Sequence, residues 1–242
     1  MKKIIYLLTV ITTLSACNNI KSNSEDYDDY NKEFIETGEV VVDFNGFGET
    51  GIDLSHHNGI DENKWNCIIE QVNPSFCFVK ASGGARFKDE DREKIYKFCK
   101  TSSVKFGAYH FFKSKFPVED QFNNWLSATS GLELDLLPVI DFEREDSGEG
   151  GFIGANPTKS DIEKLIELNE LFYNKYGKYP IIYTNIECYY ILKEMMPNHL
   201  FWIAGIRSLR GQIQQFISTI KYEKTNVSLD IDYVEDLSKF TI

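Results

Sequence analysis

The sequence predicts an α/β fold in which eight strands close into a barrel, and three observations lead to this prediction. Apolar runs typical of buried strands alternate with stretches of helical periodicity between residues 51 and 195. From residue 200 onwards, three further strand-like runs follow with no room for helices between them. Polar and aromatic residues stand at the ends of the runs. Five strand–helix units followed by three bare strands form an irregular TIM-like (β/α)5(β)3 barrel, whose active site is expected at the C-terminal strand ends.

The expected strands are short apolar runs bounded by polar or turn residues. The run from Phe76 to Val79 is typical, because a continuous apolar stretch of this length suits a strand buried on both faces. An open doubly wound sheet would use the same strands, but the helix-free final runs favour closure. The strands are predicted at residues 51–54, 76–80, 105–112, 136–142, 180–184, 200–206, 213–218 and 229–233.

The expected helices carry apolar residues three and four positions apart. In the first of them, Trp65, Ile68 and Val72 share one side. The longest begins beyond Pro157 and stops at Gly177, residues that are typical of helix ends. Helices are predicted at residues 62–72, 89–101, 118–129, 158–176 and 187–195.

The first residues are typical of a targeting segment. Lys2 and Lys3 precede an apolar stretch, residues 4–14, that is too short to cross a bilayer comfortably. Residues 14–17, Leu-Ser-Ala-Cys, resemble a bacterial lipobox, in which Cys17 is lipidated and becomes the first mature residue. An ordinary secretory signal with a chance cysteine is the alternative. We therefore expect a lipoprotein signal peptide at residues 1–16 and a cell-envelope protein anchored to a bacterial membrane through Cys17, either periplasmic or surface-exposed.

The next thirty or so residues are polar and acidic, and they are followed by the barrel sequence. Such a composition cannot bury a core, so residues 17–46 are expected to form a flexible tether and residues 47–242 a single domain. The formal net charge of the chain is −11, which argues against nucleic acid as a partner.

Four cysteines remain beyond Cys17, an even number in a compartment that permits disulfides. Their mostly apolar surroundings make buried free thiols at least as good a prediction as bridges. Zinc-type spacing is absent. The four residues are Cys67, Cys77, Cys99 and Cys188.

The most informative residues are Asp141 and Glu143, at the end of the apolar run 136–140. Because side chains alternate along a strand, these two are predicted to project from the same face. Two carboxylates held that close in a cavity cannot ionise independently, so one is expected to keep its proton toward neutral pH. A proton-donating acid beside a charged carboxylate is the equipment for cleaving a glycosidic bond. A solvated strand edge is the alternative interpretation of the same pattern.

Other strand ends carry residues suited to a sugar, which needs hydrogen bonds around its edge and an apolar ring against its face. Core packing is the competing interpretation for the aromatic residues and for the histidine, and a turn cap is the competing one for the first aspartate. The predicted site residues at these ends are Asp53, Lys80, Tyr109, His110, Tyr183, Trp202, Gln215, Asp230 and Asp232.

Two segments are the most specific in the chain: residues 51–59, Gly-Ile-Asp-Leu-Ser-His-His-Asn-Gly, and residues 138–143, Pro-Val-Ile-Asp-Phe-Glu. Further segments lie at residues 78–82, 107–111, 182–185, 202–204, 215–216 and 230–232. In this order, and over essentially the whole domain, they resemble the glycoside hydrolase family 25 lysozymes, the Chalaropsis-type N-acetylmuramidases. That family has a (β/α)5(β)3 barrel, which agrees with the count from periodicity.

The resemblance implies hydrolysis of the β-1,4 bond between N-acetylmuramic acid and N-acetylglucosamine in peptidoglycan, with retention expected. Glu143 would be the general acid. Asp141 would stabilise the charge at the anomeric carbon, either as a nucleophile or by orienting the substrate's own 2-acetamido group. Asp53 would order the pair, and Asp230 and Asp232 would shape the site. The expected partner is a peptidoglycan glycan strand, no cofactor or metal is expected, and the protein is expected to be a monomer.

Three positions depart from the family's pattern. After the Lys-Ala-Ser of residues 80–82 the family usually has Glu-Gly, whereas this chain has Gly83-Gly84. Ile206 stands in place of a tyrosine, and Gln214 in place of an aromatic residue. All three departures lie in the expected glycan cleft, so we expect altered subsite preference or reduced activity with the catalytic residues intact.

Three other functions stay open. A metal-dependent hydrolase would use His56, His57 and His110 with nearby aspartates, although adjacent histidines on an extended segment would point to opposite faces. A glycan-binding lipoprotein that kept the barrel and lost turnover would account for the missing rim groups. Another β-linked N-acetylhexosamine polymer is also possible as the substrate.

Overall fold

The computed structural model describes residues 48–144, 151–152, 156–204, 213–222 and 225–242, with only the backbone described for residues 214–222, 225–226 and 228. The predicted signal peptide, Cys17 and the predicted tether lie outside the described residues. No helix in the described ranges combines the length and the apolar character that crossing a membrane requires.

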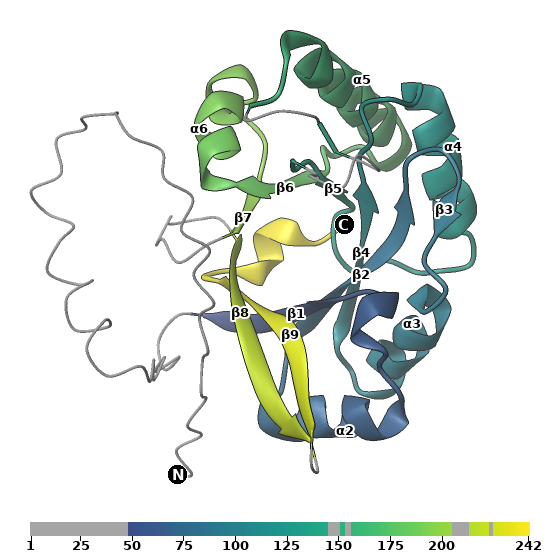
Figure 1. Ribbon diagram of the computed structural model, residues 1–242, viewed down its shortest axis with the longest axis vertical. Coiled ribbons are helices and arrows are strands. Elements are labelled where there is room, and N and C mark those ends of the chain that lie inside the picture. Colours follow the sequence, from purple (N-terminus) through teal and green to yellow (C-terminus); the bar gives the residue numbers. More distant parts are fainter. Residues whose placement is uncertain (1–47, 145–150, 153–155, 205–212, 223–224) are drawn as a thin grey trace, which may run out of the picture.

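Eight strands form a closed ring of backbone pairing (Figure 1). The strand β1 pairs in parallel with β2 and antiparallel with β9, so it joins the two ends of the sheet. From β2 through β8 successive members of the ring are parallel, and only β9 runs the other way. This ring confirms the predicted barrel. Its strands are β1 Glu49–Leu54, β2 Phe76–Gly83, β4 Lys105–Phe111, β5 Val139–Asp141, β6 Ile181–Asn185, β7 Phe201–Ala204, β8 Ile213–Tyr222 and β9 Thr225–Val234.

Helices surround the barrel in the order predicted from periodicity, one after each of the first five ring strands (Figure 1). The longest begins at a capping box, in which the backbone N–H of Asp161 donates to Thr158 Oγ1, and it ends at Gly177 in the left-handed conformation with φ of 72°. The helices are α2 Glu62–Gln71, α3 Arg92–Thr101, α4 Val118–Ala128, α5 Lys159–Tyr176 and α6 Ile186–Met195.

Several elements differ from the sequence-based boundaries. The strand β5 is shorter than the predicted 136–142, because Pro138 has no N–H to donate and Leu137 N donates instead to Phe240 O at 2.7 Å, in the C-terminal 3₁₀ helix η2 Leu237–Phe240. The strands β8 and β9 are longer than predicted and pair with each other from Gln214 opposite Tyr233 to Tyr222 opposite Thr225. A two-residue strand, β3 Phe87–Lys88, and a 3₁₀ helix, η1 His56–Asn58, were not predicted.

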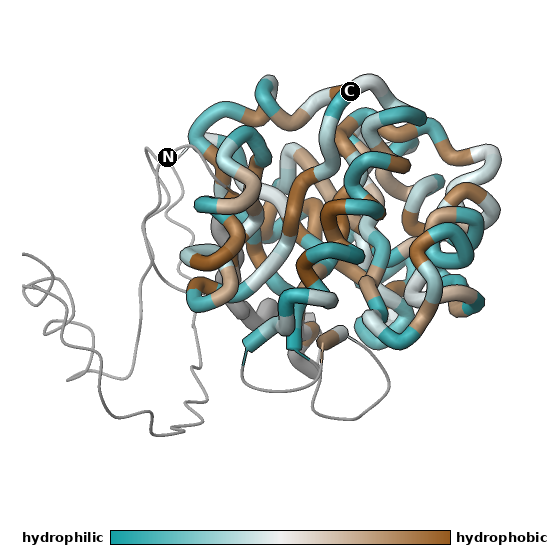
Figure 2. Tube along the Cα trace, turned by 90° about the horizontal axis from the view of Figure 1, so that it is seen from above, coloured by the Kyte–Doolittle hydropathy of each residue, from teal (hydrophilic) through white to brown (hydrophobic). Residues whose placement is uncertain are grey.

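The core has two layers, one inside the barrel and one between the barrel and the helices. In Figure 2 the hydrophobic colour is strongest in the middle of the molecule and the hydrophilic colour lies around the outside. Inside the barrel, a Cβ on Gly51 would lie 2.1 Å from the Phe76 ring, and one on Gly107 would lie 2.3 Å from the Phe78 ring. These two glycines therefore give the phenyl rings the space to fill the lumen. The lumen cluster consists of Phe76, Phe78, Leu136, Leu137, Val139, Ile181, Trp202, Ile213, Val234, Leu237 and Phe240.

Candidate active site

The strand register places carboxylates on the inner face of the barrel. Residues paired directly across neighbouring strands point to the same side of a sheet. Asp53 pairs with Phe78 of the lumen cluster, and Asp141 pairs with Tyr183, which packs against that cluster. The side chains of Asp53 and Asp141 therefore face the same interior from β1 and from β5.

Glu143 follows the end of β5, and the strand alternation continues through it. Between the two acids, Phe142 points the opposite way and packs against Phe112 and Phe152 in the outer layer, with ring centroids 5.2 Å and 5.1 Å away. Its backbone N–H donates to Tyr183 O at 2.9 Å, which fixes the chain beside β6. Asp141 and Glu143 thus share the inner side, as predicted from the spacing.

Two tyrosines stand beside these acids. Burial raises the pKa of Tyr183 well above its usual range, and the negative charges of Glu143, Asp141, Asp53 and Asp230 raise it further. Burial, together with Asp53 and Asp141, has the same effect on the pKa of Tyr109. Both hydroxyls therefore keep their protons at neutral pH and are available as hydrogen-bond donors at the site.

The strand β9 brings two further carboxylates. Asp230 pairs with Asp53, and Asp232 lies two residues further on the same face. We expected both at a C-terminal strand end, but β9 runs antiparallel, so they reach the interior from the opposite chain direction. Trp202 Nε1 donates to Asp232 Oδ1 at 2.8 Å, while Asp232 Oδ2 has no hydrogen-bond partner among the described residues.

Burial changes the protonation of this pair. It raises the pKa of Asp230 to about 6. It raises the pKa of Asp232 well above its usual range, and the carboxylates of Asp53 and Asp230 raise it further. Asp232 is therefore held protonated, and the three acids on β1 and β9 do not all carry a charge at once.

The sequence of the barrel matches a known family. The model of the family described as Glycosyl hydrolases family 25 matches residues 52–231. The chain belongs to this family. It is therefore a glycoside hydrolase, and the family's fold agrees with the closed ring of strands.

Solved structures similar to this family 25 member include three hydrolases. A family 25 glycosyl hydrolase from Bacillus anthracis has a TM-score of 0.66 and 22% identity, over 80% of this chain and 91% of that one. A bacterial lysozyme from Streptomyces coelicolor has a TM-score of 0.64 and 21% identity, over 79% and 94%. A muramidase from Acremonium alcalophilum has a TM-score of 0.61 and 18% identity, over 79% and 96%. At these identities the likeness shows the fold. No curated protein matches the chain.

Two predicted substrate contacts of this glycoside hydrolase need correction. His110 alternates with Tyr109 on β4 and so points outward, where it is 0% exposed and its Nδ1 lies 2.8 Å from Ser82 Oγ. Burial lowers its pKa to about 4, so it is a neutral core residue. Trp202 faces inward but is only 2% exposed, packed against Phe78, and it holds Asp232 rather than offering a face to a sugar.

For three residues singled out from the sequence, the structure does not describe the side chain. The register pairs Gln215 with Ala204 and with Asp232, but its side chain lies outside the described residues. The same holds for the side chain of Gln214 and for the whole of Ile206. All four cysteines beyond Cys17 are free thiols, so no disulfide joins them.

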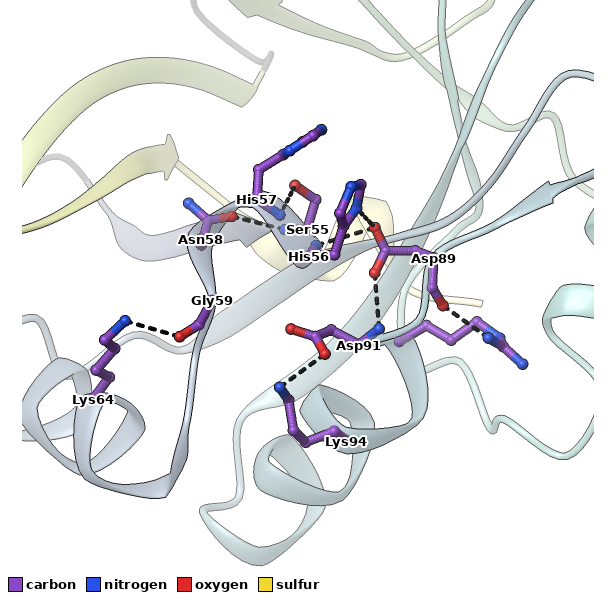
Figure 3. Close-up of polar contacts among 10 residues, drawn as sticks. Ser55, His56, His57, Asn58, Gly59, Lys64, Asp89, Asp91 and Lys94 are labelled. Carbon is purple, nitrogen blue, oxygen red and sulfur yellow. Dashed lines mark hydrogen bonds and ion pairs between the residues drawn. The ribbon is translucent and has the colours of Figure 1, made fainter.

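The predicted conformation of the loop after β1 was wrong. We expected His56 and His57 on an extended segment with opposed side chains, but they lie in the 3₁₀ turn η1 with ring centroids 3.8 Å apart (Figure 3). Ser55 caps the turn through a hydrogen bond from His57 N, and Gly59 ends it at φ of 55°. Among the residues that the structure describes, no three His, Cys, Asp or Glu side chains are arranged to hold a metal ion.

The sequence also gave no sign of the buried aspartate that anchors this turn. Asp89 is 0% exposed, and its Oδ2 accepts hydrogen bonds from His56 N at 3.1 Å and, in the tautomer with a proton on that nitrogen, from His56 Nδ1 at 2.7 Å (Figure 3). Its Oδ1 accepts from Asp91 N at 3.0 Å. We call the hydrogen bonds that Asp89 accepts from His56 the Asp89 clasp; they join the rim loop after β1 to the loop after β3. Its partners are 33 residues apart, a separation at which no local pattern operates.

Proposed function

We propose that this family 25 glycoside hydrolase cleaves the β-1,4 bond between N-acetylmuramic acid and N-acetylglucosamine in peptidoglycan. The observation that carries the proposal is the pair of acids, Asp141 and Glu143, on one side of the chain at the C-terminal end of β5, beside the protonated tyrosines. The lysozyme and the muramidase among the similar structures support the choice of this glycan.

In this proposal Glu143 donates a proton to the leaving glycosidic oxygen. It lies just past the strand end and is half-buried. Asp141, at the last position of β5, stabilises the positive charge that develops at the anomeric carbon. It acts either as a nucleophile or by orienting the substrate's 2-acetamido group, and both routes retain the anomeric configuration.

The remaining polar groups would prepare the site. Tyr109 and Tyr183 would donate hydrogen bonds to the substrate or to the carboxylates, since their protons are retained. Asp53 would order the catalytic pair from β1. The protonated Asp232 and the partly protonated Asp230 would limit the negative charge near Asp53, so that a glycan bearing carboxylates is less strongly repelled.

Reducing-end release from purified peptidoglycan tests the function. The full chain, purified in detergent, is compared with Glu143→Gln, which keeps the shape of the side chain and removes its proton-donating group. We expect fragments ending in reducing N-acetylmuramic acid from the wild type and at least a hundredfold slower release from the variant. Equal rates would remove Glu143 as the acid. Glycan binding without release by the folded wild type would assign the non-catalytic alternative, and release from another N-acetylhexosamine polymer alone would change the substrate.

We also propose that the enzyme is a lipoprotein of the cell envelope, with residues 1–16 removed, Cys17 lipidated and residues 17–46 acting as a tether to the domain from residue 47. The support is the sequence from Lys2 to Cys17. Mass spectrometry of the protein from bacterial membranes should show lipid on Cys17. A Cys17→Ser variant should leave the membrane fraction, and its continued retention there would contradict the anchor.

A further inference from the structure

Lys80, which has no acidic partner among the described residues, stands at the rim of the barrel interior, on the strand next to the one that carries Asp53. The strand β2 continues to Gly83, so Lys80 lies within it and not at its end. Lys80 Nζ lies 4.6 Å from the ring centroid of Phe111, 5.8 Å from that of Phe87 and 6.0 Å from that of Tyr109. In the part of the chain that the structure describes, this ammonium makes no salt bridge and no hydrogen bond.

Aromatic faces attract an ammonium but do not neutralise it. A cation–π contact contributes about 0.5–2 kcal/mol, and the full positive charge is still present afterwards. Lys113 adds a second positive charge on this side, with its Nζ 5.7 Å from the Phe111 centroid. Phe87 is 42% exposed, so the cluster opens to solvent. We call Lys80, Phe87, Tyr109 and Phe111 the Lys80 cluster.

The residue Gly83, also on β2, lies directly beside this cluster. It pairs with Phe111 on β4 and with Phe87 on β3, which puts it on the same face as both rings. A Cβ built on Gly83 would lie 3.3 Å from Phe111 Cβ and 3.6 Å from Phe87 Cδ1. A side chain at position 83 would therefore lie along the two rings that Lys80 also contacts. A glutamate there, as the resemblance leads one to expect, would bring its own carboxylate to the ammonium.

We propose that the Lys80 cluster, which Gly83 borders, is a subsite for a carboxylate carried on a muramoyl residue of the substrate. The substrate's carboxylate would take the place next to Lys80 that an internal acid would otherwise fill. The carboxylate comes either from the lactyl group of a peptide-free muramoyl residue or from a stem peptide. This inference rests on the proposed function, and it adds a preference for acidic glycan over neutral glycan.

The charges around the site make such a subsite necessary for an acidic substrate. The interior carries Asp53 and Asp141, whose negative charges both act on Tyr109, and the whole chain has a net charge of −11. A carboxylate-bearing glycan is repelled by these groups unless a cation lies where its substituent projects. Lys80 lies on β2, and β4 separates this strand from β5. Its ammonium can therefore bind the carboxylate substituent of the glycan while the glycosidic bond lies at Asp141.

The test is a comparison of Gly83→Glu with Gly83→Gln. The two variants place side chains of the same size beside Lys80 and differ by one charge, and Glu143→Gln is added to both so that no ligand is consumed. Affinities of the full chain are measured by calorimetry for a peptide-free muramoyl oligosaccharide, for the same oligosaccharide with its lactyl carboxylates amidated, and for a stem-peptide-bearing fragment. In the Gly83 background we expect the acidic ligand to bind about tenfold tighter than its amidated form. Gly83→Glu should remove this preference and Gly83→Gln should retain most of it.

Equal affinity for the acidic and amidated ligands, or equal behaviour of the two Gly83 variants, would overturn the subsite. If either variant fails to fold, Lys80→Met against Lys80→Arg tests the same preference, with Lys88→Met as a control on the neighbouring strand. A preference confined to the peptide-free ligand or to the stem-peptide ligand identifies the source of the carboxylate. Reducing-end release without any preference would leave the proposed function standing and refute only this inference. Absence of both binding and release would refute both.

Discussion

Replacing Asp230 with asparagine tests whether burial holds protons on the carboxylates of β9. The pKa of Asp230 is raised from an ordinary 3.8 to about 6 by burial. Because the folded-state pKa is the higher one, the stability that protonation contributes is fully present below pH 3.8 and is lost as the pH rises through 6. Relative to pH values below 3.8, the free energy of unfolding is lower by about 3 kcal/mol at pH 7, and roughly 1 kcal/mol of this loss falls between pH 5 and pH 7.

The assay is urea unfolding of the full chain at pH 5 and at pH 7, followed by tryptophan fluorescence. Asparagine keeps the size of the side chain and does not titrate. The free energy of unfolding of the wild type should therefore fall by about 1 kcal/mol more than that of Asp230→Asn between the two pH values. Asp120→Asn, at an exposed position of α4, controls for the loss of one negative charge. Equal changes in the wild type and Asp230→Asn would refute the reasoning that burial keeps a proton on β9.

Two further predictions concern buried hydrogen bonds. Asp89→Asn should lower the free energy of unfolding by about 1–3 kcal/mol in the same urea assay. The reason is that one amide oxygen cannot replace the two carboxylate oxygens that accept from His56 and from the backbone N–H of Asp91. Asp91→Asn, at a half-buried position, is the control and should lower it by less than about 1 kcal/mol. Trp202→Phe removes the indole N–H, which is the donor to Asp232 among the described residues, and should cost about 1–3 kcal/mol. An unfolding midpoint equal to that of the wild type would show that this bond contributes nothing.

The helices and the parallel strands of the barrel could be predicted because their signal is local. Apolar residues at strand and helix spacing report directly which segments are buried. Where the signal is not local, prediction failed. The C-terminal part of β8 pairs with β9 in a hairpin, and its length has no counterpart in the apolar runs that marked it. Pro138 signals a weak strand, but its neighbour's pairing with the C-terminal segment could not be anticipated.

In the candidate site, too, local patterns predicted some features and missed those that depend on contacts between distant segments. Asp141 and Glu143 could be placed on one side because two-residue alternation is a property of the strand itself. The same rule should have excluded His110, since it cannot face inward beside Tyr109. The burial of Trp202 depends on what fills the lumen around it, and the Asp89 clasp joins loops distant in sequence. Those features depend on tertiary packing, which no single segment encodes.

The filled lumen determines how a polymer can reach the acids. Phe76 and Phe78 occupy the barrel interior, with no room for a Cβ at Gly51 or Gly107 beside them. A glycan strand therefore cannot thread through the barrel and has to lie across its open end, where neither terminus of the strand needs to enter. The loops that follow the strands at that end, and not the barrel interior, therefore decide which part of a glycan strand reaches the acids.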